Sequence, residues 1–288
     1  MSKNETALVA LSDIPTALGL LSRLPVPPAD MERTAAAAWA YPVAGLILGA
    51  LAALAGAIAH AFGLPSPLTA LIALGFLILA TGAMHEDGLA DTADGLWGGW
   101  TRDRRLEIMK DSQIGTYGVV ALVLSLAARW AALSLLYDIG SGIAAAALVT
   151  AATLSRAAMP LLMARLPHAR AGGLSHSVGP VPERTAWLAL AIAALVGTAL
   201  LLLYHGDHLL SSTRCPSCYA KFAAGYLIPL TVALVSAVDI HRIAFGGARR
   251  TVGVVLLAAL FDGACRRCGT VGRLCRSALG GRVRGLRG

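Results

Sequence analysis

The sequence predicts an all-α, polytopic integral membrane protein with roughly six to seven transmembrane helices. Composition is the first observation: 57% of the 288 residues are hydrophobic and 14% are charged, whereas a soluble domain carries about 25% charged residues. The second is that the apolar residues gather in runs of the length that crosses a bilayer, about 20 residues. This composition excludes a disordered chain, and a water-soluble globule could not cover so much apolar side chain.

The expected spans follow from these runs. They are residues 36–60, 67–84, 114–136, 139–164, 186–204 and 223–240, and a further run at 251–264 is short for a crossing. Residues 14–28 are apolar but carry four prolines. Because proline interrupts helices, we expect that segment at the membrane interface or as a re-entrant stretch.

The formal net charge of +8 bears on topology. Arg and Lys concentrate in the cytoplasmic loops of membrane proteins, so we expect a lipid bilayer rather than a nucleic acid as the partner. Loops 85–113 and 165–185 are basic, whereas the connections at 61–66 and near Asp138 have no Lys or Arg. The alternation places the N-terminus and both basic loops on the cytoplasmic face of the cell inner membrane. It breaks down at 205–222, where two basic residues would fall outside.

The first basic loop opens with an acidic segment, residues 85–95. If the second span continues as a helix, Asp87, Asp91 and Asp94 are spaced i, i+4 and i+7 and share one face. Clustered carboxylates are hard oxygen ligands that suit Mg²⁺ completed by phosphate oxygens and water. Glu86 points away from that face, as an outward or supporting residue. The alternative is a solvated acidic loop, which the position directly after an apolar span disfavours.

The second half of this loop combines both signs of charge. Arg104, Glu107 and Asp111 fall on one helical face if the helix continues, with Lys110 within a turn of both acids. Carboxylates mixed with cations suit a metal–phosphate group, because the cations offset charge on phosphoryl oxygens. Ordinary ion pairing on a helix surface is the alternative.

Further charged side chains lie on or between the following spans. Arg156 is expected inside the fourth span, where a buried guanidinium needs a carboxylate or an anionic ligand, and we assign it to phosphate. Arg129, in the third span, is interpreted as a structural ion pair. His168 and Arg170 lie in the second basic loop beside two glycines, as a substrate lid or as plain linker.

The segment His85–Gly95, followed by Arg105-Leu-Glu-Ile-Met-Lys-Asp-Ser-Gln-Ile-Gly-Thr-Tyr-Gly118, closely resembles the cobalamin synthase family, the adenosylcobinamide-GDP ribazoletransferases. The resemblance extends outward to Leu21-Ser-Arg-Leu-Pro-Val-Pro27 and Met163-Ala-Arg-Leu-Pro-His-Ala-Arg170, and covers roughly residues 14–205.

The resemblance implies a Mg²⁺-dependent membrane enzyme that joins adenosylcobinamide-GDP to α-ribazole, or to its 5′-phosphate, and releases GMP. Mg²⁺ would bind Asp87, Asp91 and Asp94. Glu107 or Asp111 would accept the proton of the nucleophile, beside Lys110. Substrate-binding residues would be Arg104, Arg105, Arg156, His168 and Arg170. Homo-oligomers or other corrinoid-pathway enzymes are further expected partners.

The chain is expected to form one membrane-embedded catalytic domain, residues 1–264, followed by a tail. Residues 265–288 hold seven arginines and three cysteines but no acid. A Gly-Gly-x-Thr-Gly-Asp stretch expected from the family is missing, so a frame error, a lineage-specific tail and a zinc site stay open for this region.

Two other functions compete with this interpretation. Asp91-Thr-Ala-Asp94-Gly95 begins like the motif of CDP-alcohol phosphotransferases, but Gly98-Gly99 stands where that motif has Ala-Arg. A transporter would place its acids near the bilayer midplane, usually within internal repeats, whereas here they cluster in one loop.

Overall fold

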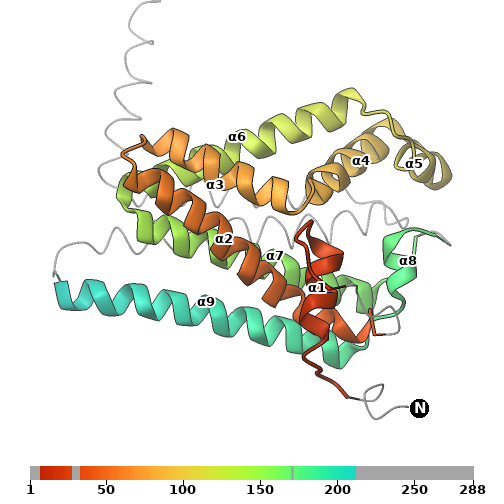
Figure 1. Cartoon of the computed structure of the whole chain (residues 1–288). Helices are drawn as coiled ribbons and strands as arrows, with labels where there is room; N and C mark the ends of the chain where they lie inside the picture. Colours follow the sequence, from red (N-terminus) through yellow and green to blue (C-terminus); the bar gives the residue numbers. More distant parts are fainter. Residues whose placement is uncertain (1–6, 28–32, 170–171, 212–288) are drawn as a thin grey trace, which may run out of the picture. The chain divides into compact units, whose positions relative to one another are not determined.

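The computed structural model describes residues 7–27, 33–169 and 172–211, and the following account concerns these residues alone. They form nine α-helices and one 3₁₀ helix, η1, with no strand in the described ranges (Figure 1). In chain order the elements are α1 (Asp13–Leu21), η1 (Ala36–Ala40), α2 (Tyr41–Ala61), α3 (Ser66–Ala80), α4 (Met84–Gly98), α5 (Arg102–Ile108), α6 (Thr116–Ile139), α7 (Ser141–Arg165), α8 (Leu174–Val178) and α9 (Glu183–Ser211).

Four of these helices are long and apolar enough to cross a membrane, and α3 with α4 would add a fifth if that bent pair is one span. The expected spans at 36–60, 114–136, 139–164 and 186–204 each correspond to one of the four. The all-α, multi-span character is therefore confirmed, whereas the expected six to seven spans are not. The runs at 223–240 and 251–264 lie outside the described residues. The expected domain boundary at residue 264 and the tail at 265–288 lie outside them as well.

The bundle is built around the close approach of α2 and α7. A β-carbon added to Gly49 would lie 2.9 Å from the Val149 Cα and 3.0 Å from the Ala152 Cβ. One added to Gly45 would meet the backbone of Ala152, with the carbonyl carbon at 2.9 Å. Small residues permit this approach, which is how membrane helices gain packing energy when the hydrophobic effect cannot drive their association.

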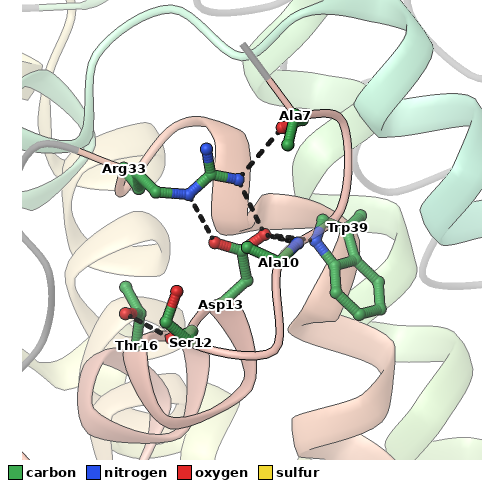
Figure 2. Close-up of polar contacts among 7 residues, drawn as sticks. All are labelled: Ala7, Ala10, Ser12, Asp13, Thr16, Arg33 and Trp39. Carbon is green, nitrogen blue, oxygen red and sulfur yellow. Dashed lines mark hydrogen bonds and ion pairs between the residues drawn. The ribbon is translucent and has the colours of Figure 1, made fainter. Parts of the chain in front are cut away.

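A buried ion pair fixes the N-terminal segment (Figure 2). The Arg33 Nε donates to Asp13 Oδ1 at 2.9 Å and its Nη2 to Asp13 Oδ2 at 3.0 Å, while the Trp39 Nε1 donates to the same Oδ2 at 2.7 Å. Asp13 is fully buried and Arg33 is 4% exposed. This bidentate pair joins α1 to η1 and the start of the first span, so the predicted interfacial segment is a short helix packed on the bundle.

The second expected span does not continue as one helix. It ends at Ala80, and α4 begins at Met84 with its axis bent by 85° (Figure 1). Gly82 and Ala83 between them have positive φ angles of 63° and 56°. The left-handed conformation cannot extend a right-handed helix, so it turns the chain there. The second span therefore does not continue into the acidic segment as one helix, which was the condition stated for the three aspartates to share a face. We call the resulting turn, residues 81–83, the α3–α4 corner.

Candidate active site

The expected acidic loop is a helix, α4, and Asp87, Asp91 and Asp94 all lie on it. The corner therefore does not separate the three carboxylates, and their i, i+4, i+7 spacing places them on one side of α4. Their environments differ. Asp87 is exposed, Asp91 is partly buried and Asp94 is only 8% exposed.

Asp94 is held by the start of α6. The Gly115 amide donates to Asp94 Oδ2 at 2.7 Å, and the Gly118 amide donates to Asp94 Oδ1 at 2.8 Å. These N–H groups at a helix N-terminus have no partner within the helix, and the helix dipole favours a negative charge beside them. Asp94 thus caps α6 from another helix, a contact that the sequence spacing did not predict.

The two glycines are required by this contact. A β-carbon added to either Gly115 or Gly118 would collide with the Asp94 carboxylate, and at Gly118 it would also lie 3.1 Å from the Ala90 carbonyl oxygen. Glycine permits such a close approach because it has no Cβ. The structure identifies Asp94 as the group that approaches.

The basic half of the expected loop is only partly helical. α5 ends at Ile108, so Asp111 does not extend a helical face begun by Arg104 and Glu107. Instead, the Asp111 amide donates to the Ile108 carbonyl at 3.1 Å, and Asp111 Oδ1 accepts from the Gln113 amide at 3.2 Å. The expected single face through all three residues was wrong, because the helix stops one turn too early.

Arg104 and Glu107 form an exposed ion pair at 2.7 Å. This contact agrees with the alternative of ordinary helix-surface pairing, which contributes little to stability. Lys110 is exposed just beyond the helix. The Arg105 Nε donates to the Gly99 carbonyl at 2.9 Å and so fastens α5 to the end of α4.

The two basic loops lie together in space, as the topology requires. The Arg102 Nη2 on α5 donates to the carbonyl of Ala169, in the segment between α7 and α8, at 2.9 Å. In that segment, His168 lies with its ring 5.4 Å from the ring of His176, and its Nδ1 is 3.4 Å from the Ser175 hydroxyl. Arg170 lies outside the described residues. The lid role proposed for His168 stays a prediction.

A buried polar cluster lies behind the acidic face. Glu86 Oε1 accepts from the Arg129 Nη2 at 2.9 Å, joining α4 to α6. Arg156 on α7 is 6% exposed, its Nη1 donates to the Ser155 hydroxyl at 2.9 Å, and it interacts electrostatically with Glu86 and Arg129. The prediction that Arg129 forms an ion pair is confirmed. Glu86 points away from the face that carries the three aspartates, as expected. It points into the bundle rather than outward, because its carboxylate pairs with Arg129.

Sequence reasoning overlooked two features near the acidic face. His85, at the start of α4, belongs to the buried cluster, and its buried Nε2 has no hydrogen-bond partner in the part of the chain that the structure describes. Trp97 on α4 stacks on Tyr117 on α6, with ring centroids 6.5 Å apart. Trp97 follows Asp94 by three residues, and residues at that spacing are neighbours on a helix surface. The sequence could therefore have placed Trp97 beside the acidic face.

These carboxylates are compatible with a Mg²⁺ ion that is bound by one or two of them and otherwise by substrate and water. Among the described residues, no three His, Cys, Asp or Glu side chains are grouped closely enough to enclose a metal. Mg²⁺ does not need such a cage, because proteins bind it through one or two carboxylates and let substrate phosphates and water complete the octahedron. Asp87 and Asp91 could provide those carboxylates. Asp94 has each oxygen already engaged by an amide, although each retains a second lone pair.

The fold and this face define a multi-span helical membrane protein with clustered carboxylates and arginines at one end of its bundle. The chain belongs to the cobalamin-5-phosphate synthase family, whose model matches residues 13–260. The match extends well past residue 205, where the resemblance recognised in the sequence ended.

Similar proteins with assigned names are consistent with this family membership. An adenosylcobinamide-GDP ribazoletransferase from Bradyrhizobium diazoefficiens is 46% identical over 200 residues, which cover 68% of this chain and 76% of that protein. One from Mesorhizobium japonicum is 44% identical over 216 residues, covering 74% of this chain and 82% of that protein. No solved structure matches the chain. Neither a CDP-alcohol phosphotransferase nor a transporter is supported by these matches.

Proposed function

We propose that this protein is an adenosylcobinamide-GDP ribazoletransferase. It joins adenosylcobinamide-GDP to α-ribazole, or to α-ribazole 5′-phosphate, and releases GMP, forming adenosylcobalamin or its 5′-phosphate. The observation that carries the proposal is the continuous family match over residues 13–260, which includes the whole acidic helix α4 and the basic helix α5. Relatives of that name align with about two thirds of the chain or more.

The reaction is a phosphoryl transfer with a simple balance of bonds. A ribose hydroxyl of α-ribazole forms a new O–P bond at the phosphorus that carries the cobinamide. The P–O bond from that phosphorus to GMP breaks, and GMP leaves with the electron pair. The hydroxyl proton passes to a carboxylate. Such reactions depend on positioning and on stabilising negative charge on the phosphoryl oxygens.

The acidic face is the proposed metal position. When bound, Mg²⁺ would neutralise charge on the diphosphate and on the leaving GMP. Asp87, Asp91 and Asp94 make up the face that would hold it, with Asp87 and Asp91 as the direct ligands. Asp94 would act mainly by fixing α4 against α6, because both of its oxygens already accept amide hydrogens.

The residues of α5 and the turn after it would handle the proton and the phosphoryl charge. Glu107 and Asp111 are both exposed carboxylates, within reach of solvent and substrate, and either could accept the proton. Glu107 would first have to exchange its ion pair with Arg104. Lys110, which is exposed, would offset charge on the phosphoryl oxygens, as would Arg104 once released from that pair.

The remaining basic residues have more distant roles in this proposal. Arg105 would hold α5 against α4 through the Gly99 carbonyl and contact the bound substrate. Arg156 would place positive charge beneath the acidic face, and His168, with Arg170, would cover the bound substrate. The active face would be cytoplasmic on the cell inner membrane. Homo-oligomers and contacts with other corrinoid-pathway enzymes belong to the same proposal.

The proposal is tested with the purified full-length protein in detergent or nanodiscs. Adenosylcobinamide-GDP and α-ribazole are supplied with and without Mg²⁺, and GMP and the corrinoid product are quantified by chromatography. The expected result is equimolar GMP and product, only with both substrates and Mg²⁺. GMP release without α-ribazole would indicate hydrolysis, and absence of product from an inserted, folded protein would contradict the proposed activity.

A further inference from the structure

Arg23 lies beside the α3–α4 corner, and neither the sequence analysis nor the proposed mechanism assigns a role to its charge. Arg23 follows α1, in the segment that passes beside the corner (Figure 1). Its backbone amide donates to the carbonyl of Ala80, the last residue of α3, at 2.8 Å. This bond fixes the Arg23 backbone at the point where the second span ends.

The side chain of Arg23 lies over Gly82. A β-carbon added to Gly82 would lie 2.6 Å from the Arg23 Nε and 2.9 Å from its Cγ. The arginine stem and the start of its head group therefore lie directly on the glycine backbone. The positive φ at Gly82 favours glycine there, and a larger residue would also have to displace the Arg23 side chain.

The guanidinium charge of Arg23 has no partner among the described residues. The residue is exposed, and its guanidinium makes no hydrogen bond or ion pair with any part of the chain that the structure describes. Other arginines contrast with it: Arg33 pairs with Asp13, Arg129 with Glu86 and Arg165 with Glu183. A guanidinium whose donors are not used by the described residues can bind an anion from outside, since its planar fork matches phosphate oxygens.

The anion is indicated by the neighbouring residues. Asp87 lies in the first turn of α4, five residues after Gly82, and Asp91 one turn further on. A diphosphate that approaches these carboxylates is repelled by them unless cations are also close. We propose that Arg23 binds the diphosphate of the nucleoside-diphosphate substrate at the α3–α4 corner, as a substrate-binding residue of the same active site. This inference rests on the proposed function.

Binding of Mg·GDP by the full-length protein in nanodiscs tests the role directly, with R23Q, R23K and the matched control R184Q. Arg184 is another exposed arginine, in the first turn of α9. R23Q should weaken Mg·GDP binding by about tenfold or more, the loss expected for hydrogen bonds to a charged group. R23K should fall between R23Q and wild type, because lysine keeps the charge without the fork, and R184Q should match wild type.

Turnover separates this role from a structural one. R23Q should raise KM for adenosylcobinamide-GDP and leave KM for α-ribazole unchanged, with thermal unfolding close to that of wild type. Equal Mg·GDP affinity for R23Q and wild type would overturn the inference, as would a defect seen only in binding to anionic lipid vesicles. If R23Q does not insert, R23K decides, since it retains most of the stem over Gly82. A wild-type protein that neither binds Mg·GDP nor releases GMP would instead refute the proposed function.

Discussion

Substitution of Asp94 by Asn is the most informative single change for the architecture of the site. The carboxylate accepts amide hydrogens from both Gly115 and Gly118. An Asn side chain has the same shape but only one acceptor oxygen, and its NH₂ group would face the second amide as donor against donor. One amide at the start of α6 would lose its partner, and the helix N-terminus would lose its negative charge.

The magnitude follows from these two losses. A hydrogen bond to a charged group contributes about 1.5–3 kcal/mol, and burying an unsatisfied amide costs a similar amount. The charge at the helix N-terminus adds about 0.3–1 kcal/mol. We therefore expect D94N to weaken the attachment of α6 to α4 by roughly 2–4 kcal/mol. Because about 1.4 kcal/mol corresponds to a tenfold change, local opening should increase by about 30-fold to several hundred-fold.

Hydrogen exchange followed by mass spectrometry, on peptides that cover residues 112–122, measures this opening. D94N should accelerate exchange there and leave α2 and α7 unchanged, while D87N, which alters an exposed carboxylate on the same helix, should have no such effect. Wild-type exchange in D94N, together with lost activity, would mean that Asp94 acts on the metal or substrate rather than on the fold, and would refute this reasoning.

Three further predictions concern the rest of the bundle. Burial alone would raise the pKa of Asp13, but hydrogen bonds from Arg33, Trp39 and the Ala10 amide, with the Arg33 charge, hold the pKa below its ordinary value. The stability that Asp13 contributes should thus be complete above pH of about 4 and be lost as pH falls through the lower folded value. D13N should abolish that dependence in detergent unfolding and cost about 3–5 kcal/mol, because the buried Arg33 guanidinium would lose its carboxylate counter-charge. G49L should destabilise the bundle by about 1–3 kcal/mol or more through overpacking against α7, whereas G75L, with open space around it, should be neutral in the same assay. Single cysteines that replace Asp103 and Gly172, after removal of the native cysteines, should react only with membrane-permeant thiol reagents in intact cells. Labelling by an impermeant reagent would contradict the predicted topology.

Helical periodicity was sufficient to place Asp87, Asp91 and Asp94 together, because the three lie within one helix. Long apolar runs were sufficient for the described spans, since length and hydropathy are properties of local sequence. The 85° bend at the corner was not predicted, because helical periodicity carries no information on the positive φ angles that Gly82 and Ala83 adopt. Helix continuation past Ile108 failed for a similar reason, as nothing between Glu107 and Asp111 opposes a helix strongly.

Contacts between distant segments could not be read from the sequence at all. Asp94 meets Gly115 and Gly118 across two helix ends, and Asp13 meets Arg33 and Trp39 across a chain reversal. Apart from the Ala10 amide, which also donates to Asp13, these donors lie far from the carboxylates in sequence. The spacing therefore predicted Asp94 only as a third metal ligand. Its hydrogen bonds to Gly115 and Gly118 show that it also holds α4 against α6.

GMP release by D91N, measured beside wild type and D103N, tests most directly whether the acidic face of α4 is the catalytic centre. Asp91 lies partly buried on that face, and Asp103 is exposed on α5. At saturating substrates and Mg²⁺, D91N should lose about 100-fold or more of turnover, consistent with several kcal/mol of charge stabilisation, while its thermal unfolding stays at the wild-type value. D103N should retain nearly full turnover. Wild-type turnover in a folded D91N protein, or equal losses in both variants, would contradict the assignment of the active site to α4.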